Sequence, residues 1–286
     1  MSAPRGLLND FIRFSSVDGP GNRFVAFLQG CNFDCIFCHN PYTINTCVDC
    51  GICVEPCPED ALFWGDNGAG VKVDWSLCNL CGVCVDVCPY DSTPLARSVT
   101  VDALWEEVNE TANFLSGVTI SGGEATLQAD FVAGLFAAIK DRSGTSHLTT
   151  FLDSNGSCGP EIWDRLLPVT DGTMIDLKAL DEDVHIALTG VSNNRVLDSI
   201  RYLAVRRRLY EVRLPLIPGF NDSDDQLART ANWLAGVDPA LRVKVIGYRR
   251  QGVRSQYGEL QEPQPEQMAH YAHILTGEGV RDVVQV

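Results

Sequence analysis

Long apolar runs are absent from this chain of 286 residues. No stretch reaches the roughly 18 consecutive apolar residues that a membrane-spanning helix needs. The N-terminal stretch MSAPRGLLNDFIRF is interrupted by Asn9, Asp10 and Arg13, so it lacks the charged-then-apolar pattern of a secretory leader. We therefore expect a cytoplasmic protein that does not act in a membrane.

Positive charge is scarce, because 22 Lys and Arg residues stand against 37 Asp and Glu residues, for a formal net charge of −15 at pH 7. Nucleic acids and anionic membranes attract clustered Lys and Arg, so this balance argues against either as the main partner. A partner that presents a basic or neutral docking face suits this acidic chain better. The 45% of hydrophobic residues excludes a disordered chain, and the length predicts one large domain or a domain with a small module.

Cysteine is almost missing outside one segment, since only Cys158 of the twelve cysteines lies outside residues 31–88. Chains rich in disulfides are short and secreted, whereas a cytosolic chain keeps its thiols reduced and gathers them for metal or redox chemistry. The gathered cysteines therefore predict metal sites. Cys158 is expected to be a buried or incidental thiol.

An internal repeat contains eight of the cysteines. TCVDCGICVEPCP (46–58) and LCNLCGVCVDVCP (77–89) align without gaps at a spacing of 31 residues. Each run reads Cys-x2-Cys-x2-Cys-x3-Cys-Pro, the pattern of bacterial ferredoxins with two [4Fe–4S] clusters, in which the fourth cysteine of one run binds the cluster of the other. Structural zinc is the alternative, but zinc usually draws its ligands as separated pairs. The expected ligand sets are Cys47, Cys50, Cys53 with Cys88, and Cys78, Cys81, Cys84 with Cys57.

The rest of the chain alternates apolar runs with amphipathic stretches, the rhythm of βα units. Strands are expected at 23–30, 117–121, 148–154, 173–177, 212–217 and 241–247, and helices from 101 to before Gly117 and at 127–140, 161–167, 193–208 and 224–235. Right-handed crossovers turn about six such units into a partial (β/α)6 TIM-like barrel, with site residues just after the strands. The predicted α/β fold has a barrel of residues 1–41 and 97–286 and an inserted ferredoxin-like module of residues 42–96 with two [4Fe–4S] clusters.

Three further cysteines, Cys31, Cys35 and Cys38, lie in GCNFDCIFCHNP with no fourth cysteine nearby. Three thiolates hold three corners of a cubane cluster, and the fourth iron is then free to chelate the amino and carboxylate groups of a small molecule. A Cys3His zinc site with His39 is the alternative. The adjacent Cys38 and His39 would have difficulty reaching one tetrahedral ion together.

Cys-x3-Cys-x2-Cys at the end of the first strand, followed by SGGEA, resembles the radical S-adenosylmethionine (radical SAM) superfamily. FSSVDGPGNRFVAFLQGCNFDCIFCHNP, the two-cluster insertion, SGGEA, DSNG, MIDLKA and LIPGFND resemble glycyl-radical-enzyme activating enzymes, most closely the YjjW-type activases, over about residues 14–222. The resemblance implies three [4Fe–4S] clusters, of which the one on Cys31, Cys35 and Cys38 binds S-adenosylmethionine (SAM). It also implies a glycyl radical enzyme with a C-terminal glycine loop as partner, a flavodoxin or ferredoxin reductant, and a monomer.

The resemblance assigns contacts with SAM. Phe37 would pack on the adenine, Gly122, Gly123 and Glu124 would bind the amino group, and Lys178 would pair with the carboxylate. Two of these assignments have a structural alternative. Phe37 could be an ordinary core residue, as single Phe residues often are, and Gly122 and Gly123 could simply form a turn.

Other positions follow from the same resemblance. Asp153, Ser154, Asp176 and the backbone of Met174 would contact SAM or form a monovalent cation site, although Asp153 and Asp176 also suit solvated positions. Arg249 would replace a His that holds the SAM carboxylate in related enzymes, unless it is a surface Arg. Arg213 would face SAM from inside the barrel. Asp18 and Gly19, in DGPG, would lie near the glycine loop of the partner, although turn chemistry also explains this motif.

The implied reaction is one-electron cleavage of SAM to methionine and a 5′-deoxyadenosyl radical, which removes a hydrogen atom from a glycine Cα of the partner. No general acid or base is required, and none of the five His residues has a paired context that suggests one. The two-cluster module would relay electrons or help dock the partner. A radical SAM enzyme acting on a small molecule is the alternative, while a pure electron-transfer protein would leave SGGEA, DSNG and MIDLK without a role.

Overall fold

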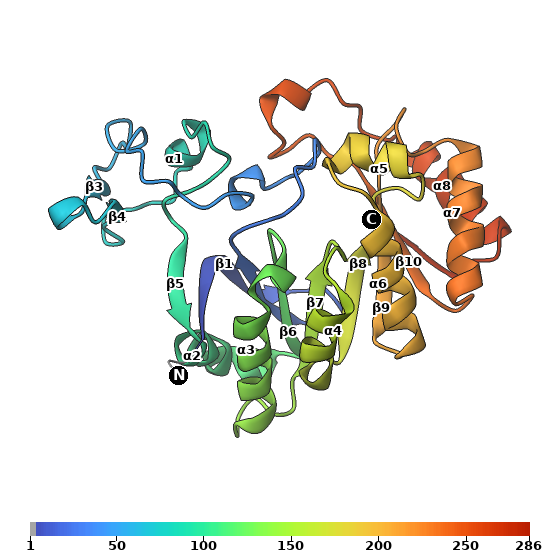
Figure 1. Cartoon of the computed structure of the whole chain (residues 1–286), viewed down its shortest axis with the longest axis horizontal. Helices are drawn as coiled ribbons and strands as arrows, with labels where there is room; N and C mark the ends of the chain where they lie inside the picture. Colours follow the sequence, from blue (N-terminus) through green and yellow to red (C-terminus); the bar gives the residue numbers. More distant parts are fainter. Residues whose placement is uncertain (1–3) are drawn as a thin grey trace.

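A nine-stranded, largely parallel sheet forms the centre of the protein, as seen in a computed structural model that describes residues 4–286, apart from the side chain of Asn67 (Figure 1). The strand order is β11-β10-β9-β8-β7-β6-β2-β1-β5, and β2 and β6 to β11 run parallel to one another. The strands are β1 (Arg5–Ser15), β2 (Arg23–Leu28), β5 (Arg97–Thr100), β6 (Gly117–Gly122), β7 (Thr149–Ser154), β8 (Gly172–Asp176), β9 (Leu209–Leu216), β10 (Arg242–Gly247) and β11 (Asp282–Gln285). The α/β fold with a parallel sheet is confirmed.

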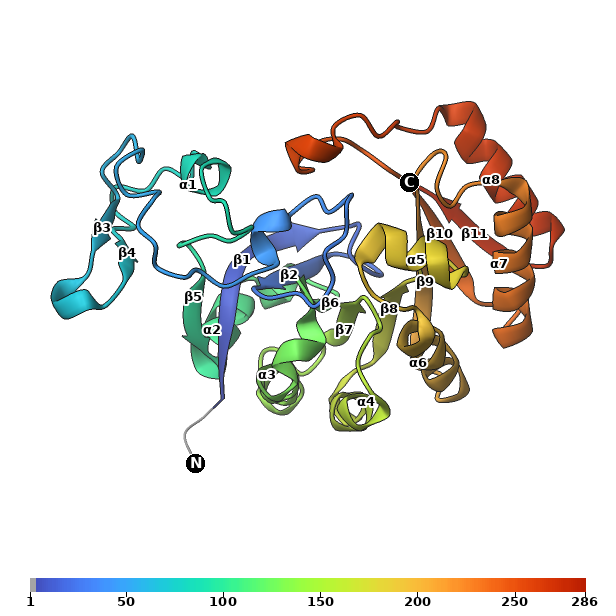
Figure 2. The same ribbon diagram turned by 45° about the horizontal axis from the view of Figure 1, so that its top comes forward.

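Helices cover one side of this sheet, while the opposite side curves around the interior (Figure 2). The helices are α1 (Val83–Asp86), α2 (Val101–Thr111), α3 (Ala129–Asp141), α4 (Pro160–Leu166), α5 (Glu182–Thr189), α6 (Asn194–Val205), α7 (Asp224–Val237) and α8 (Pro265–Gly277). In the part of the chain that the structure describes, no helix is long and apolar enough to cross a membrane.

Local sequence explains where several helices begin and end. The Thr100 hydroxyl caps α2 by accepting from Ala103 N, and Ser223 caps α7 in a capping box with Gln226. The expected helix at 193–208 is too long, because α6 ends at Val205 and Arg207 adopts a positive φ of 55°. A left-handed residue stops helical hydrogen bonding, so the chain turns there into β9.

The side chain of Arg23, at the start of β2, is a fully buried cation. Its guanidinium donates to Thr119 Oγ1 (2.7 Å), to Thr149 Oγ1 (2.9 Å) and to the carbonyl oxygens of Pro20, Val118 and Thr149. The guanidinium also lies 4.4 Å from the ring centroid of Phe151. These contacts replace the water that a buried charge would otherwise need.

Residues 42–96, which we call the cysteine-rich segment, project from one edge of the sheet (Figures 1 and 2). The segment holds the two-stranded sheet of β3 (Leu62–Trp64) and β4 (Val71–Val73) together with α1, and a small core of its own formed by Cys53, Leu62, Val71 and Cys84. The 31-residue repeat extends to the backbone, because positive φ angles recur at Asp49 and Leu80, at Gly51 and Gly82, and at Asp60 and Asp91.

The two ends of the cysteine-rich segment meet at a neck, which we define as Asn45, Tyr90 and Asp91. Asn45 N donates to Asp91 O (3.1 Å), and Asn45 Nδ2 donates to Tyr90 O (3.0 Å). The neck is attached to β2 through Gln29, whose Nε2 donates to Tyr42 O (2.7 Å) and Asn45 O (2.6 Å).

Candidate active site

A cavity of about 260 Å³ opens at the carboxyl ends of the parallel strands. Loops after neighbouring parallel strands converge at this end of the sheet, so reactive side chains gather there. The cavity is lined by Cys31, Phe33, Cys35, Phe37, Cys38, His39, Ser121, Gly122, Gly123, Asp153, Ser154, Asn155, Asp176, Lys178, Arg213, Pro215, Ile246, Gly247 and Tyr248.

The cluster loop, residues 30–44 after β2, brings the first three cysteines to one wall of this cavity. Cys31 N donates to Ile44 O (2.9 Å), which ties the two ends of the loop together. Cys38 N donates to Cys35 O (3.1 Å), which closes a turn between these two ligand candidates. The predicted grouping of Cys31, Cys35 and Cys38 therefore coincides with a common position in space.

Burial raises the pKa of the Cys31 thiol to about 11 and that of Cys35 to about 12, although the Lys178 ammonium opposes the increase at both. Buried thiols ionise readily only beside compensating positive charge, which iron would supply. Three such thiols on one wall fit a group that takes three thiolate ligands. Among residues 4–286, no three His, Cys, Asp or Glu side chains are arranged to hold a single metal ion.

The glycines of SGGEA press the loop after β6 against the cluster loop. Gly123 N donates to Leu28 O (2.8 Å), and Glu124 N donates to Gly30 O (2.7 Å). A Cβ atom on Gly123 would lie 2.2 Å from Gly30 O and 2.8 Å from Thr43 O, closer than real Cβ atoms approach backbone. Glycine at position 123 is thus required by the contact between these two loops.

Glu124 is almost completely buried and does not line the cavity. Its carboxylate accepts from Thr126 N (2.9 Å), Thr126 Oγ1 (2.5 Å), Ser154 Oγ (2.8 Å) and Asn155 N (2.7 Å). Burial raises the pKa of Glu124, while these four donors favour its ionised form. Glu124 therefore links the loop after β6 to the end of β7. Its expected contact with the amino group of SAM stays a prediction.

Four charged side chains form the floor of the cavity. Asp153 Oδ2 accepts from Arg213 Nη1 (2.9 Å), and Asp176 Oδ2 accepts from Lys178 Nζ (2.9 Å). Lys178 Nζ also lies 5.4 Å from the ring centroid of Phe37. All four side chains are at least two-thirds buried, so the alternative of solvated turn residues does not hold. Two positive and two negative groups leave the floor with no formal net charge.

Burial shapes the electrostatics of this floor. It raises the pKa of Asp153 to about 6, against the opposing effect of Arg213 and with a contribution from the neighbouring Asp176. Burial would lower the pKa of Lys178, but the Asp176 carboxylate and the sulfur atoms of Cys35 and Cys31 together outweigh burial, and the pKa is raised. Lys178 therefore stays protonated and is available to an anionic group.

Arg249 is exposed and lies outside the cavity, in a separate hollow with Glu262. The neighbouring Tyr248 lines the cavity instead, and its buried hydroxyl has no hydrogen-bond partner. The Tyr248 ring lies 6.3 Å from the His39 ring between centroids. The structure thus gives no support to Arg249 as a cavity residue.

Asp18 and Gly19 do not line the cavity either. They precede β2, at the opposite end of the strands, where Asp18 O accepts from Thr119 Oγ1 (2.7 Å) and Asp18 Oδ2 accepts from Ser15 Oγ (2.5 Å). Their expected position beside a partner loop stays a prediction.

Some lining residues were not identified from the sequence. Phe33 and Asn155 belong to the motifs GCNFDCIFCHNP and DSNG and so could have been found, whereas His39 was considered only as a zinc ligand. Asn155 Nδ2 donates to Asn32 Oδ1 (3.0 Å). Tyr248 carries no comparable signal, because a lone aromatic residue after a strand is most often core.

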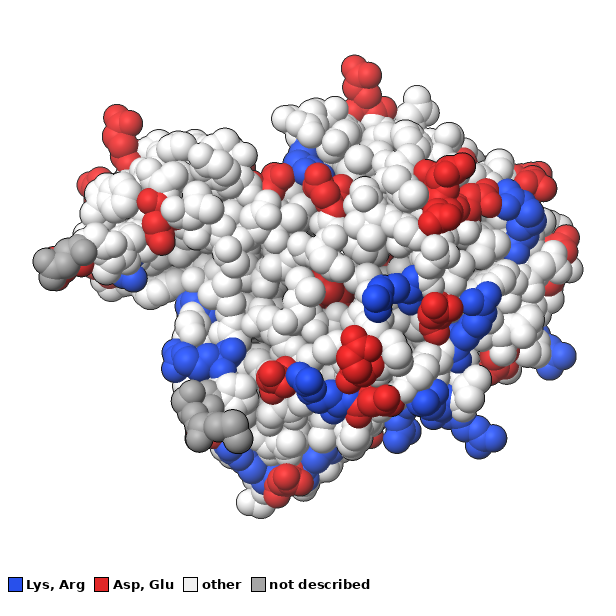
Figure 3. All heavy atoms as spheres, in the orientation of Figure 1, with Lys and Arg blue, Asp and Glu red and all other residues white. Residues whose placement is uncertain are grey.

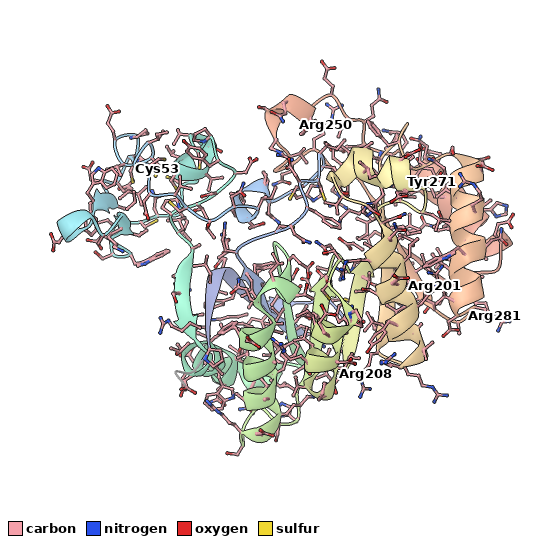
Figure 4. All side chains as sticks on the ribbon, viewed as in Figure 1. Cys53, Arg201, Arg208, Arg250, Tyr271 and Arg281 are labelled. Atoms are coloured by element: carbon pink, nitrogen blue, oxygen red, sulfur yellow. The ribbon has the colours of Figure 1, made fainter. Side chains whose placement is uncertain are left out.

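The remaining eight ligand candidates gather in the cysteine-rich segment, where Cys53 is labelled in Figure 4. Burial raises the pKa of Cys53, and nearby Cys47, Cys50 and Cys88 raise it further, so these four thiols lie within electrostatic reach of one another. The other four line one small cavity together: Cys57, Cys78, Cys81 and Cys84. Each group draws three cysteines from one run and one from the other.

Comparison with known proteins extends these observations. Residues 25–231 match the Radical SAM superfamily. The chain is 31% identical over 253 residues to pyruvate formate-lyase 1-activating enzyme of Escherichia coli strain K12, with 86% of this chain and 82% of the relative covered. It is 31% identical over 250 residues to (2S)-3-sulfopropanediol dehydratase activating enzyme of Klebsiella oxytoca, covering 81% and 78%.

Among solved structures, Streptococcus suis SuiB bound to the precursor peptide SuiA is similar with a TM-score of 0.57 at 12% identity. The match covers 92% of this chain and 48% of SuiB, and it supports the fold alone. The superfamily match spans more than half of the chain, and the relatives are matched over most of their length. The chain therefore belongs to the radical SAM superfamily and, within it, to the family of the glycyl-radical-enzyme activating enzymes.

Proposed function

We propose that the cavity binds SAM on a [4Fe–4S] cluster held by Cys31, Cys35 and Cys38, and that the enzyme activates a glycyl radical enzyme. The observation that carries this proposal is the meeting of three thiols, one of them buried and two partly buried, with a charge-balanced floor in one cavity. When bound, the reduced cluster supplies one electron for cleavage of SAM to methionine and a 5′-deoxyadenosyl radical, which takes a hydrogen atom from a glycine Cα.

The side chains of the cavity suit the parts of SAM. Lys178 and Arg213 offer cations for its carboxylate, and Phe37 offers an aromatic face for its adenine. The Cβ-free backbone of Gly122 and Gly123 allows close approach of the ligand. The buried walls exclude water, which protects a radical from side reactions.

A monovalent cation at Asp153, Ser154, Asp176 and the Met174 carbonyl belongs to the same proposal. Both carboxylates lie on the floor, and the Ser154 hydroxyl donates to Glu124 while its oxygen keeps lone pairs for a cation. A hard cation prefers such oxygen ligands.

We further propose that residues 42–96 are a ferredoxin-like module with two auxiliary [4Fe–4S] clusters, bound by Cys47, Cys50, Cys53 and Cys88 and by Cys57, Cys78, Cys81 and Cys84. The mutual effects on thiol pKa support the first set, and the shared cavity supports the second. Crossing of the runs is the arrangement that two-cluster ferredoxins use. This segment would pass electrons from a flavodoxin or ferredoxin to the cluster that binds SAM.

The charge of the surface bears on docking. Figure 3 shows Lys and Arg interspersed with Asp and Glu over the lower and right parts of one face, whereas the cysteine-rich segment at the left shows acidic side chains, a large uncharged surface and little basic surface. Lys72 is the one basic residue of this segment, against acidic residues throughout it. A partner of the segment would therefore present a basic or neutral face.

The decisive experiment mixes reduced, reconstituted protein with SAM under anaerobic conditions and measures 5′-deoxyadenosine. We expect release of 5′-deoxyadenosine, and a glycyl radical signal in electron paramagnetic resonance (EPR) spectra when the cognate glycyl radical enzyme is present. No release from fully reconstituted protein would refute the proposal. Turnover of a metabolite without a protein partner would instead favour the small-molecule alternative.

Two variants test the ligand assignment. Cys31→Ala should abolish cleavage and retain roughly two thirds of the iron, because the other eight ligands are separate. Cys158→Ala is the matched control, since Cys158 lies outside all three groups, and it should retain both iron and activity. Proportional loss of iron from all clusters in Cys31→Ala would show that the grouping is wrong.

A further inference from the structure

Arg254 joins parts of the chain that lie far apart in sequence. It follows β10, yet its Nη2 donates to Cys35 O (2.9 Å) and lies 2.6 Å from Asp34 Oδ1, while its Nη1 lies 3.0 Å from Asp91 Oδ2. Its guanidinium also lies 5.3 Å from the ring centroid of Tyr257. The Arg254 side chain is only 14% exposed, so these contacts hold it away from water.

Each acceptor of Arg254 has a structural role. Cys35 O is the carbonyl that also accepts from Cys38 N and so closes the turn of the cluster loop. Asp91 belongs to the neck, where its own carbonyl accepts from Asn45 N. One guanidinium therefore holds the cluster loop and the neck of the cysteine-rich segment at a common point.

The Arg254 guanidinium balances negative charge where the cluster loop meets the neck. Asp34 and Asp91 both approach the same guanidinium, so its removal would leave two neighbouring carboxylates that repel each other. The Nε of Arg254 is buried without a partner among the described residues.

We propose that Arg254 is a positioning residue that holds the neck against the cluster loop and favours the reduced state of the cluster on Cys31, Cys35 and Cys38. The proposal rests on the proposed function for the presence of that cluster. A positive charge beside an iron–sulfur cluster stabilises the form with the extra electron, and hydrogen bonding around the cluster acts in the same direction. A fixed neck would also keep the distance constant over which electrons pass from the cysteine-rich segment to this cluster.

The test compares Arg254→Gln, Arg254→Lys and a control, Arg250→Gln. Arg250 is an exposed residue of the same loop, labelled in Figure 4, and its side chain bonds only locally, with Nε donating to Leu260 O (3.0 Å). The first measurement is an EPR-monitored redox titration of the cluster whose signal changes on addition of SAM. The second is hydrogen exchange at the Asn45 amide of the neck. Iron content is measured on every sample.

Arg254→Gln should lower the equilibrium constant for one-electron reduction of that cluster about tenfold, which is a decrease of about 59 mV in midpoint potential, and should speed exchange at Asn45. Arg254→Lys keeps the charge but not the planar fork, so it should keep the midpoint potential and still speed exchange. Arg250→Gln should change neither.

Equal midpoint potentials and equal exchange in Arg254→Gln and Arg250→Gln would overturn the inference. A midpoint potential lowered equally by Gln and Lys would overturn the part that rests on charge. Failure of the wild-type protein to bind the three-cysteine cluster would refute the proposed function instead. In that case, hydrogen exchange at the Asn45 amide still tests the contact between Arg254 and the neck, because this measurement requires no cluster.

Discussion

A methyl group at position 123 is expected to separate the two loops that form the cavity. In Gly123→Ala, the new Cβ would lie 2.2 Å from Gly30 O, 2.6 Å from Gly30 C and 2.8 Å from Thr43 O. All three neighbours are backbone atoms, so no side chain can rotate away. Overpacking of this kind costs about 1–3 kcal/mol. The hydrogen bonds from Gly123 N and Glu124 N to the facing strand and loop are lost as well, at about 1 kcal/mol each.

The expected total is a loss of roughly 3–5 kcal/mol. At an unfolding entropy of about 2.1 cal/mol/K per residue, this lowers the melting temperature of a chain of this size by about 5–8 °C. Scanning calorimetry of reconstituted protein at one fixed scan rate measures this shift, and iron analysis reports whether the cluster loop still binds. Gly236→Ala in α7 is the control, since its Cβ would meet nothing within 4 Å and helix propensity should raise stability by about 0.5–1 kcal/mol. A Gly123→Ala protein that melts within about 2 °C of the wild type and keeps its iron would refute the reasoning.

Three further predictions concern buried or paired charges. Glu124→Gln sets an amide N–H₂ group against donors such as Thr126 N and should cost about 2–4 kcal/mol; an unchanged melting temperature would contradict it. Arg23→Met leaves buried carbonyl oxygens without donors and should cost a similar amount; a variant as stable as the wild type in the same scan would show that these acceptors find other partners. For Asp171, burial would raise the pKa, but the Lys140 ammonium and a backbone amide outweigh it and lower the pKa. A lowered pKa stabilises the fold above the unfolded-state value of about 4, and this contribution is lost as the pH falls below it. The difference in melting temperature between wild type and Asp171→Asn should therefore shrink from pH 6 to pH 3, and a constant difference would exclude this linkage.

Much of the parallel sheet could be predicted from the sequence, because strands such as β2 and β6 are continuous apolar runs buried on both faces. The edge strands β5 and β11, and β1 next to β5, were missed because few of their residues are buried. In β1 only Gly6 and Leu8 are buried and the strand includes Asn9 and Asp10, while β11 is only four residues long and has no fully buried residue. Both depend on a neighbouring strand for their stability rather than on their own composition.

The residues of the candidate site likewise divide into those that the sequence could identify and those that it could not. Cysteine spacing was sufficient to group the ligand candidates, because metal ligands leave a local pattern. Tyr248 and Arg254 could not be found in this way, since their roles arise only when the loop after β10 folds over residues more than 200 positions earlier. Glu124 shows the converse, because its motif was found but the structure surrounds its carboxylate with four donors.

The neck has a consequence for how such a protein could arise. Because Asn45 and Asp91 are joined by a backbone hydrogen bond, the 45 residues between them begin and end at one place. Excision of that piece would leave two chain ends already in contact, and of the connections between strands of the large sheet only the one from β2 to β5 would be shortened. Ancestral chains could thus have acquired or discarded the whole piece in a single genetic event, with the order of strands and the cavity that they form inherited intact.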